Sequence, residues 1–237
     1  MESSNSTILV MQTSIPQDNL IDYVQGQLNA FFPDGQSVKR SDLFAGISDA
    51  LDRLEHCFQR IRVSRYSADK QAFFNHLYSD QYLMFLWFLS NSLWKRGAHE
   101  ITLNKVYLLN KCLHAFDCAF DTALPDVFIV VHGVGTVLGK AKYSDFFVAY
   151  QGCTVGQSQG IYPKIGRGVG LGAGASVVGN SSIGDYASIS TGCTIVNRTV
   201  ESNSTAYRDE NGKLIFRKSR PAAIGLQYFF EEDLLKS

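Results

Sequence analysis

The sequence predicts an α+β protein in which a helical amino-terminal half is followed by a left-handed parallel β-helix. Three observations predict this division. Apolar residues recur every three or four positions in the first half and every six positions in the second half. Most of the 20 glycines lie in the second half, clustered between Gly152 and Gly192. A chain of 237 residues that is 45% hydrophobic is long enough to bury a core in both halves.

The first half carries the pattern of amphipathic helices. One apolar face is formed by residues spaced three or four positions apart: Leu43, Ile47, Leu51, Leu54, Phe58 and Ile61. Further helices are predicted from about Asp18 to Phe31, Asp69 to Tyr78, Asp80 to Lys95 and Glu100 to His114. The helix that begins near Asp80 is apolar nearly all round, so we expect it to be buried, and Gly97 is suited to end it. The histidines of this half lack the spacing of metal ligands, so we expect them to be structural or solvent-facing: His56, His76, His99 and His114.

The second half is built on a six-residue repeat. Large apolar residues stand six positions apart at Ile165, Leu171, Val177, Ile183, Ile189 and Ile195. Four positions after these come residues that are small or β-branched: Val169, Ala175, Ser181, Ala187 and Cys193. A period of six fits a short strand followed by a corner, with one large residue per unit pointing inward. Three units close one triangular turn, and this pattern is typical of a left-handed coil, an exception to the right-handed rule for parallel crossovers.

The repeat is interrupted at one place, which predicts a loop that leaves the coil. Val155 and Ile165 are ten positions apart rather than six, so the residues around Gln157 to Pro163 must project. Loops on a regular scaffold often carry binding groups. After the coil, the residues from Tyr207 to Gly212 are typical of a hairpin turn. The expected domains are a helical region (1–115), a β-helix (116–200) and a carboxy-terminal tail (201–237).

Composition and charge exclude several classes of function. The chain has 22 basic and 22 acidic residues, so it lacks the basic field that a nucleic acid or an anionic membrane would attract. The most apolar run, Tyr82 to Leu89, is less than half the length that a bilayer requires. The first residues lack the basic start and the apolar stretch of a signal peptide. The five cysteines include no CxxC pair, which suits reduced thiols. We therefore expect a cytoplasmic protein without membrane insertion.

The glycine-rich stretch from Gly166 to Gly174 also suggests a nucleotide-binding loop. Such a loop requires a preceding strand and a following long helix, and the helical pattern is missing here. Because the six-residue repeat accounts for these glycines, the coil is the favoured interpretation.

Four segments follow one another along the second half: His132-Gly-Val-Gly-Thr-Val-Leu-Gly139, Gln151-Gly-Cys-Thr-Val-Gly156, Tyr162-Pro-Lys-Ile165 and Leu171-Gly-Ala-Gly-Ala175. In this order they resemble the serine acetyltransferase branch of the hexapeptide-repeat acyltransferases. The resemblance covers about residues 105 to 197, and the helical first half is similar in kind to that family's amino-terminal domain. The repeat alone indicates the superfamily, whereas the segments with His132 and Tyr162 narrow it to the branch.

The resemblance implies acetyl-CoA-dependent transfer of an acetyl group to a hydroxyl. In the family a histidine acts as general base on the acceptor hydroxyl, which attacks the thioester directly, and His132 matches that position. An imidazole, with an ordinary pKa of about 6.5, can accept such a proton. A carboxylate fifteen residues earlier orients the imidazole in the family. Asp117 has that spacing, and Asp121 and Asp126 are alternatives close by. Without the resemblance, His132 would be interpreted as a surface histidine at a corner of the coil.

The resemblance also implies a cofactor groove and an oligomer. The family binds the pantetheine arm of CoA in the groove between neighbouring β-helices, and the matching positions here are Gly156, Ala173, Ser188 and Thr191. Because that groove exists only between subunits, we expect a homotrimer or a dimer of trimers. No metal is expected, since a carbonic-anhydrase-like zinc site on this fold needs three histidines from the coils and the coils contain one.

The sequence departs from the family where the acceptor is bound. The family has an acidic residue directly before the histidine, and a basic residue and a second histidine before the Pro-Lys pair. Here these positions hold Val131, Ile161 and Tyr162, which leave the charges of an amino acid poorly paired. We expect the acceptor to be L-serine or a related small hydroxyl compound. A sugar hydroxyl of surface-polysaccharide synthesis is an alternative, because Tyr162 can stack on a sugar ring, and a non-catalytic β-helix scaffold is an alternative of another class.

Overall fold

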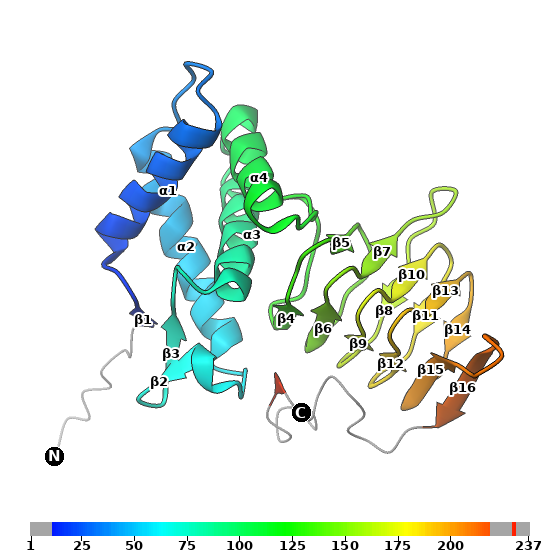
Figure 1. The fold of residues 1–237 in the computed structure, drawn as a ribbon. Coiled ribbons are helices and arrows are strands. Elements are labelled where there is room, and N and C mark those ends of the chain that lie inside the picture. The colour runs from blue at the N-terminus through cyan, green and yellow to red at the C-terminus, as the bar shows by residue number, and fades with distance from the viewer. Residues whose placement is uncertain (1–10, 219–228, 231–237) are drawn as a thin grey trace, which may run out of the picture.

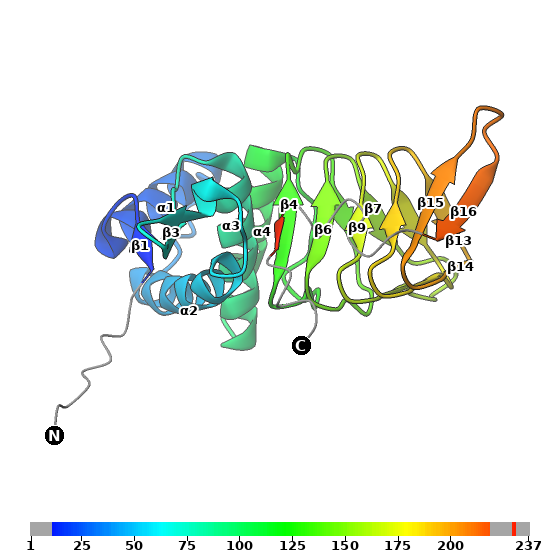
Figure 2. The same cartoon turned by 90° about the horizontal axis from the view of Figure 1, so that it is seen from below.

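The computed structural model describes residues 11–218 and 229–230. The helices lie together at one end of the molecule with three short strands beside them, and the strands that come after the last helix follow as a coil (Figure 1). In the perpendicular view the helices form a block against one end of the coil, and the last two strands lie at the opposite end (Figure 2). Residues 1–10 of the predicted helical region and residues 219–228 and 231–237 of the predicted tail lie outside the described residues.

Four α-helices form the first half of the described chain. They are α1 (Gln17–Phe31), α2 (Arg40–Phe58), α3 (Ser79–Lys95) and α4 (Glu100–His114). As the all-round apolar pattern predicted, α3 is buried along most of its length, packed between α2 and α4. Gly97 follows the end of α3 with a φ of 71°, a left-handed conformation that commonly terminates helices. Within the described residues, no helix combines the length and apolarity needed to cross a bilayer.

The segment predicted as a helix from about residue 69 to 78 is a β-hairpin, so that prediction was wrong. A single 3-10 turn leads into a three-stranded sheet of order β1–β3–β2: η1 (Ser64–Tyr66), β1 (Gln12–Thr13), β2 (Ser67–Ala68) and β3 (Gln71–Phe74). Asp69 and Lys70 reverse the chain with φ angles of 49° and 64°. The buried Ala72 and Phe74 alternate with half-buried neighbours along β3. A period of two and paired aromatic residues favour a strand, and this short signal was overlooked beside the longer helical patterns.

The second half is a left-handed parallel β-helix of about four turns. Its strands form three sheets, which we call the first, second and third faces. The first face contains β4 (Phe128–Val131), β6 (Phe147–Tyr150), β9 (Gly170–Leu171), β12 (Ser188–Ile189), β15 (Ser204–Arg208) and β16 (Leu214–Lys218). The second face contains β5 (Val137–Leu138), β7 (Thr154–Gly156), β10 (Ser176–Val178) and β13 (Thr194–Val196). The third face contains β8 (Lys164–Ile165), β11 (Ser182–Ile183) and β14 (Thr199–Val200).

The six-residue repeat correctly predicted the interior of the coil. The large apolar residues at positions 165, 171, 177, 183, 189 and 195 are each at most 2% exposed. They stack in register from turn to turn, with Leu171 beside Ile189 and Val177 beside Ile195. The small residues four positions later are also buried, so both parts of each unit face inward.

Left-handed backbone conformations mark the three corners of the coil. The first corner joins the first face to the second and contains Gly135, Gly152, Gly174 and Gly192. The second corner joins the second face to the third and contains Gly179, Asn197 and the projecting loop between β7 and β8. The third corner leads back to the first face and contains Phe146, Gly168, Tyr186 and Asn203.

The last two strands form the predicted hairpin. β15 pairs in parallel with β12, and β16 turns back to pair antiparallel with β15, so the turn expected between Tyr207 and Gly212 is confirmed. The described chain reappears at Phe229 and Phe230, where Phe230 forms an antiparallel bridge with Ile61 beside the helices. The predicted domain boundaries at residues 115 and 200 stay predictions.

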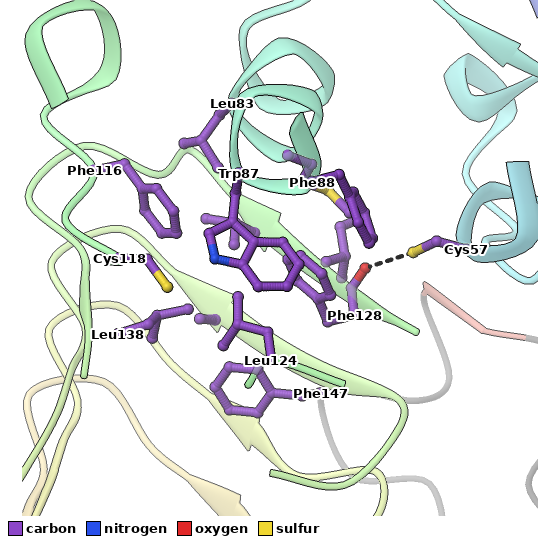
Figure 3. Packing of buried hydrophobic residues seen from close by; sticks show 14 of the residues in the cluster. Cys57, Leu83, Trp87, Phe88, Phe116, Cys118, Leu124, Phe128, Leu138 and Phe147 are labelled. Atoms are coloured by element: carbon purple, nitrogen blue, oxygen red, sulfur yellow. Dashed lines mark hydrogen bonds between the residues drawn. The ribbon is translucent and has the colours of Figure 1, made fainter. Parts of the chain in front are cut away.

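The helices and the coil share one hydrophobic core (Figure 3). Trp87 and Phe88 of α3 pack on Phe128 of β4, with ring centroids 5.3 and 5.4 Å apart. The thiol of Cys57 in α2 donates a hydrogen bond to the carbonyl oxygen of Phe128 over 3.1 Å, and burial raises its pKa to about 12. Because this core is continuous, α3 is held against the first turn of the coil, at the strand that leads into His132.

Candidate active site

His132 lies at the first corner of the coil, directly after β4, beside a cavity of about 210 Å³. The cavity lies between the helices and the coil. Its walls come from the start of α3 (residues 78–80 and 83), from His114 at the end of α4, and from residues 132–134 of the coil. Three segments distant in sequence therefore meet at the histidine that the sequence singled out.

The backbone of His132 is held in an unfavourable conformation. Its φ is 54°, a left-handed value that costs a residue with a Cβ roughly 1–2 kcal/mol. The N–H of His132 donates to Asp80 Oδ1 over 3.1 Å, and its carbonyl oxygen accepts from the N–H of Val134 over 2.6 Å. Leu83 of α3 occupies the space where a side chain at Gly133 would lie. Strain fixed from several sides in this way is concentrated at functional sites.

Asp80 is a buried carboxylate that the sequence analysis missed. It is the second residue of α3 and is 6% exposed. Burial raises its pKa, while hydrogen bonds from the backbone N–H groups of His132 and Gly133 act in the opposite direction. An acidic residue in the first turn of a helix is common, so nothing in its position distinguished Asp80.

His114 is also part of the cavity, although the sequence analysis expected a structural or solvent-facing histidine. It is the last residue of α4 and is 8% exposed. Its Nδ1 lies 2.8 Å from Oδ1 of Asn110. Burial lowers the pKa of His114 to about 4, so its imidazole is uncharged near neutral pH.

Asp117 and Asp121 are bound to other partners in the structure. The Asp117 carboxylate accepts hydrogen bonds from the hydroxyl of Tyr107 and from Nζ of Lys111, each over 2.6 Å. Burial on its own would raise the pKa of Asp117, but these two hydrogen bonds hold it below its ordinary value. Asp121 forms an ion pair of 2.6 Å with a lysine of the coil. Within residues 11–218, no hydrogen bond or ion pair joins either carboxylate to His132, and the orienting role of Asp117 stays a prediction.

Two of the predicted CoA-contact residues lie on the same corner as His132. Equivalent positions in successive turns form a row, which we call the corner row: Val134, Gln151, Ala173 and Thr191. The carbonyl oxygen of each of the first three accepts a hydrogen bond of 2.8–3.0 Å from a corner glycine of the next turn. Ser188 is buried in β12, the strand that leads into this corner. Gly156 ends β7 and therefore lies at the second corner.

The three predicted acceptor-binding residues fall in two places. Val131 ends β4 and is half-buried beside His132. Ile161 and Tyr162 are each 48% exposed in the projecting loop at the second corner. Reciprocal backbone hydrogen bonds of 3.0 and 3.1 Å between Ser158 and Ile161 close this loop. Within one chain the loop does not line the cavity beside His132.

The chain is similar in sequence and in fold to proteins named serine acetyltransferases. No protein-family model matches the chain. The serine acetyltransferase of Haemophilus influenzae is 28% identical over 152 residues, which are 61% of this chain and 56% of that relative. The serine acetyltransferase of Synechococcus elongatus is 38% identical over 91 residues, which are 36% of each chain. The matched part thus spans about half of the first relative and about a third of the second.

A solved structure extends the likeness over most of the chain. The serine acetyltransferase of Neisseria gonorrhoeae superposes with a TM-score of 0.63 at 20% identity, covering 87% of this chain and 81% of that chain. The three-faced coil and its six-residue period define the class, and the chain is a hexapeptide-repeat β-helix protein. Within that class its sequence and fold are similar to those of serine acetyltransferases.

Proposed function

We propose that the chain is an acetyl-CoA-dependent O-acetyltransferase that acts on a small hydroxyl compound, L-serine or a relative of it, with His132 as general base. The observation that carries this proposal is the position of His132 at the head of the corner row, two residues before Val134. The relatives named serine acetyltransferases support the same class of reaction.

The part of the reaction that this chain supplies is a positioned base. When bound, acetyl-CoA would supply a thioester whose carbonyl carbon is open to attack by a hydroxyl. The imidazole of His132 accepts the hydroxyl proton as the new C–O bond forms, and returns a proton to the sulfur as the C–S bond breaks. Asp80 and Leu83 fix the backbone of His132, so the base is held in place before the acceptor arrives.

The corner row suits a thin, extended ligand such as the pantetheine arm. Thr191 is exposed and Ala173 is partly exposed, and both are followed by glycine. A Cβ built at Gly172 would lie 2.8 Å from the backbone nitrogen of Thr191, so the turns stack too closely here for a side chain. Ala173 and Thr191 would hold the arm, with Gly156 contributed from a second corner.

We also infer that the chain assembles as a homotrimer or a dimer of trimers. Gly156, Ile161 and Tyr162 lie at the second corner, whereas His132 lies at the first. A site that uses both corners therefore needs two chains side by side. Light scattering coupled to size-exclusion chromatography should give three or six times the 26.3 kDa of one chain, and a monomer would contradict this inference.

The general base is tested by replacing His132 with asparagine. Asparagine tolerates a left-handed backbone better than alanine does, so His132→Asn removes the imidazole with little added strain. We expect the rate of thiol release from acetyl-CoA to fall about 10²- to 10⁴-fold, the usual contribution of a general base. The matched control is His99→Asn, an exposed histidine that caps α4 and that asparagine can replace as a cap. An unchanged rate in His132→Asn, or wild-type protein that fails to bind acetyl-CoA at millimolar concentration, would favour the scaffold alternative.

A sugar O-acetyltransferase is the second candidate, and one observation favours it. Neither lysine nor arginine is among the residues that line the cavity beside His132, so the carboxylate of L-serine would lack a cationic partner there. Thiol release measured with L-serine and with nucleotide-linked sugars separates the two candidates. Turnover of L-serine at ordinary enzyme rates would exclude the sugar acceptor.

A further inference from the structure

His114 lines the cavity, and only one of its ring nitrogens, Nδ1, is hydrogen-bonded within the described residues. The other, Nε2, is not among the fully buried unpaired atoms of those residues, so a ligand can reach it. The amide nitrogen of Asn110 donates to the carbonyl oxygen of Leu83 over 3.0 Å, which leaves Oδ1 of Asn110 facing the histidine. Because Oδ1 can only accept, Nδ1 of His114 must carry the hydrogen of that 2.8 Å bond. The lone pair of the neutral ring is then on Nε2, and no side chain or backbone group between residues 11 and 218 donates to it.

The ring is uncharged at neutral pH because it is buried, so the tautomer that Asn110 sets is kept. His114 packs against the edge of Tyr82, with ring centroids 5.9 Å apart, and is 8% exposed. Its pKa of about 4 keeps the imidazole uncharged. Since His114 lines the cavity, its Nε2 is available there as a hydrogen-bond acceptor and not as a donor.

Two further side chains of the cavity can accept hydrogen bonds, Asp80 and His132, while the hydroxyls of Tyr78 and Ser79 can donate or accept. Asp80 presents a carboxylate that is already bonded to the backbone of His132, and His132 is the proposed base. The cavity thus has three acceptors for the hydrogen bonds of a ligand hydroxyl, and neither lysine nor arginine lines it to pair with a ligand carboxylate. Its volume of about 210 Å³ is smaller than the 300–1,000 Å³ typical of sites for drug-sized ligands, so the part of the acceptor inside it is small.

We propose that His114 is a specificity-determining residue whose Nε2 accepts a hydrogen bond from a second hydroxyl of the acceptor, next to the hydroxyl that is acetylated. The acceptor class is then a polyol or the edge of a sugar without a carboxylate beside the reacting carbon. This inference rests on the proposed acetyltransferase function. It disfavours L-serine, whose carboxylate would lie unpaired near Asp80.

The kinetic test compares two acceptors that differ in hydrogen-bond donors. Glycerol offers further hydroxyls, whereas 1-propanol offers none beyond the reacting one. Wild-type protein should prefer glycerol over 1-propanol by at least about tenfold in kcat/KM, the effect of leaving a buried acceptor unpaired. His114→Phe, which keeps a ring against Tyr82, should reduce that preference to about twofold or less. His114→Gln retains an acceptor oxygen and should keep part of it.

This ratio separates recognition from a structural role. A histidine that only supports the fold would lower the rates with both acceptors equally and leave the preference unchanged, which would overturn the proposal. A wild-type preference for L-serine over glycerol would overturn it as well. Circular dichroism confirms that each variant is folded, and if His114→Phe fails to fold, the comparison rests on His114→Gln.

A second measurement tests the inference without turnover. Long-range ¹H–¹⁵N correlation spectra of histidine-labelled protein should show His114 as the neutral tautomer protonated at Nδ1 at pH 7. Adding glycerol should shift its Nε2 resonance, and adding L-serine at the same concentration should not. A cationic ring, the opposite tautomer, or an Nε2 resonance unmoved by glycerol would overturn the inference. Absence of thiol release with every acceptor would instead reject the proposed function.

Discussion

Gly133, the residue after His132, packs against Leu83 of α3. The substitution Gly133→Ala tests whether this contact holds the His132 segment in place. A Cβ built at Gly133 would overlap Cδ1 of Leu83 and lie 3.0 Å from Cγ1 of Val130. Carbon atoms that are not bonded ordinarily approach to about 3.5–4.0 Å. Gly133 does not have a left-handed φ, so alanine adds steric overlap there without backbone strain.

The expected magnitude follows from the packing. Overfilling a close-packed site costs about 1–3 kcal/mol, and we expect Gly133→Ala to lower the free energy of unfolding by that amount. Leu83 is 1% exposed, so Leu83→Ala should cost about 2–5 kcal/mol. In the double variant the new methyl group enters the space that Leu83 leaves. The double variant should therefore be more stable than the sum of the two single changes, by about 1–2 kcal/mol.

Urea unfolding followed by far-ultraviolet circular dichroism measures these differences. All variants are compared at one protein concentration, because association of chains contributes to apparent stability. Thiol release by Gly133→Ala should also fall, since the methyl group pushes the His132 segment away from α3. Two results would refute the inference that α3 holds the His132 segment in place. One is a change in unfolding free energy below about 0.5 kcal/mol for Gly133→Ala, and the other is strict additivity in the double variant.

Three further predictions use other features of the fold. Gly46→Ala in α2 should destabilise by about 1–3 kcal/mol, because its Cβ would lie 2.7 Å from Cδ2 of Leu93. Gly26→Ala in α1 should stabilise by about 0.5–1 kcal/mol, because nothing lies within 4 Å of its Cβ; urea midpoints that move in the same direction would contradict this pair. His114 has a folded pKa of about 4, below its ordinary value of about 6.5, so the unfolded chain binds the proton first as pH falls. The stability that goes with this low pKa is fully present above pH 6.5 and is lost as pH falls towards 4. The free energy of unfolding falls over this range by up to about 3 kcal/mol. The difference in unfolding free energy between wild type and His114→Gln should change between pH 7 and pH 5, and a constant difference would count against the low pKa. Cys112 is exposed and the other four cysteines are buried, so titration with a thiol reagent should show one fast equivalent in the native protein, which Cys112→Ser removes.

The coil could be predicted residue by residue because every turn repeats the same environment. Ile165, Leu171 and Val177 each lie beside an isoleucine one turn further along the coil, so one rule for a single unit applies to all of them. The face of α2 was predictable for a similar reason, since its period of 3.6 is sustained over several turns of helix. A regular pattern carries its structural information locally.

The cavity could not be predicted in this way, because its walls depend on contacts between distant segments. Asp80 and His132 are 52 positions apart, and no periodic signal joins them. His114 is placed in the wall by the end of α4, while Asn110 and Leu83 set its tautomer. The hairpin at β2 and β3 was missed for a different reason: its alternation extends over four residues only.

The antiparallel strand β16 has a consequence for how coils meet end to end. A parallel coil finishes with unpaired strand edges, which can act as templates for another chain and lead to fibres. On the first face β16 covers the edge of β15, runs against the direction of the other strands, and carries exposed Arg217 and Lys218. The opposite end of the coil is covered by the helices (Figure 2). With a helical cap at one end and a reversed, charged strand on the first face at the other, end-to-end strand pairing through the first face is opposed.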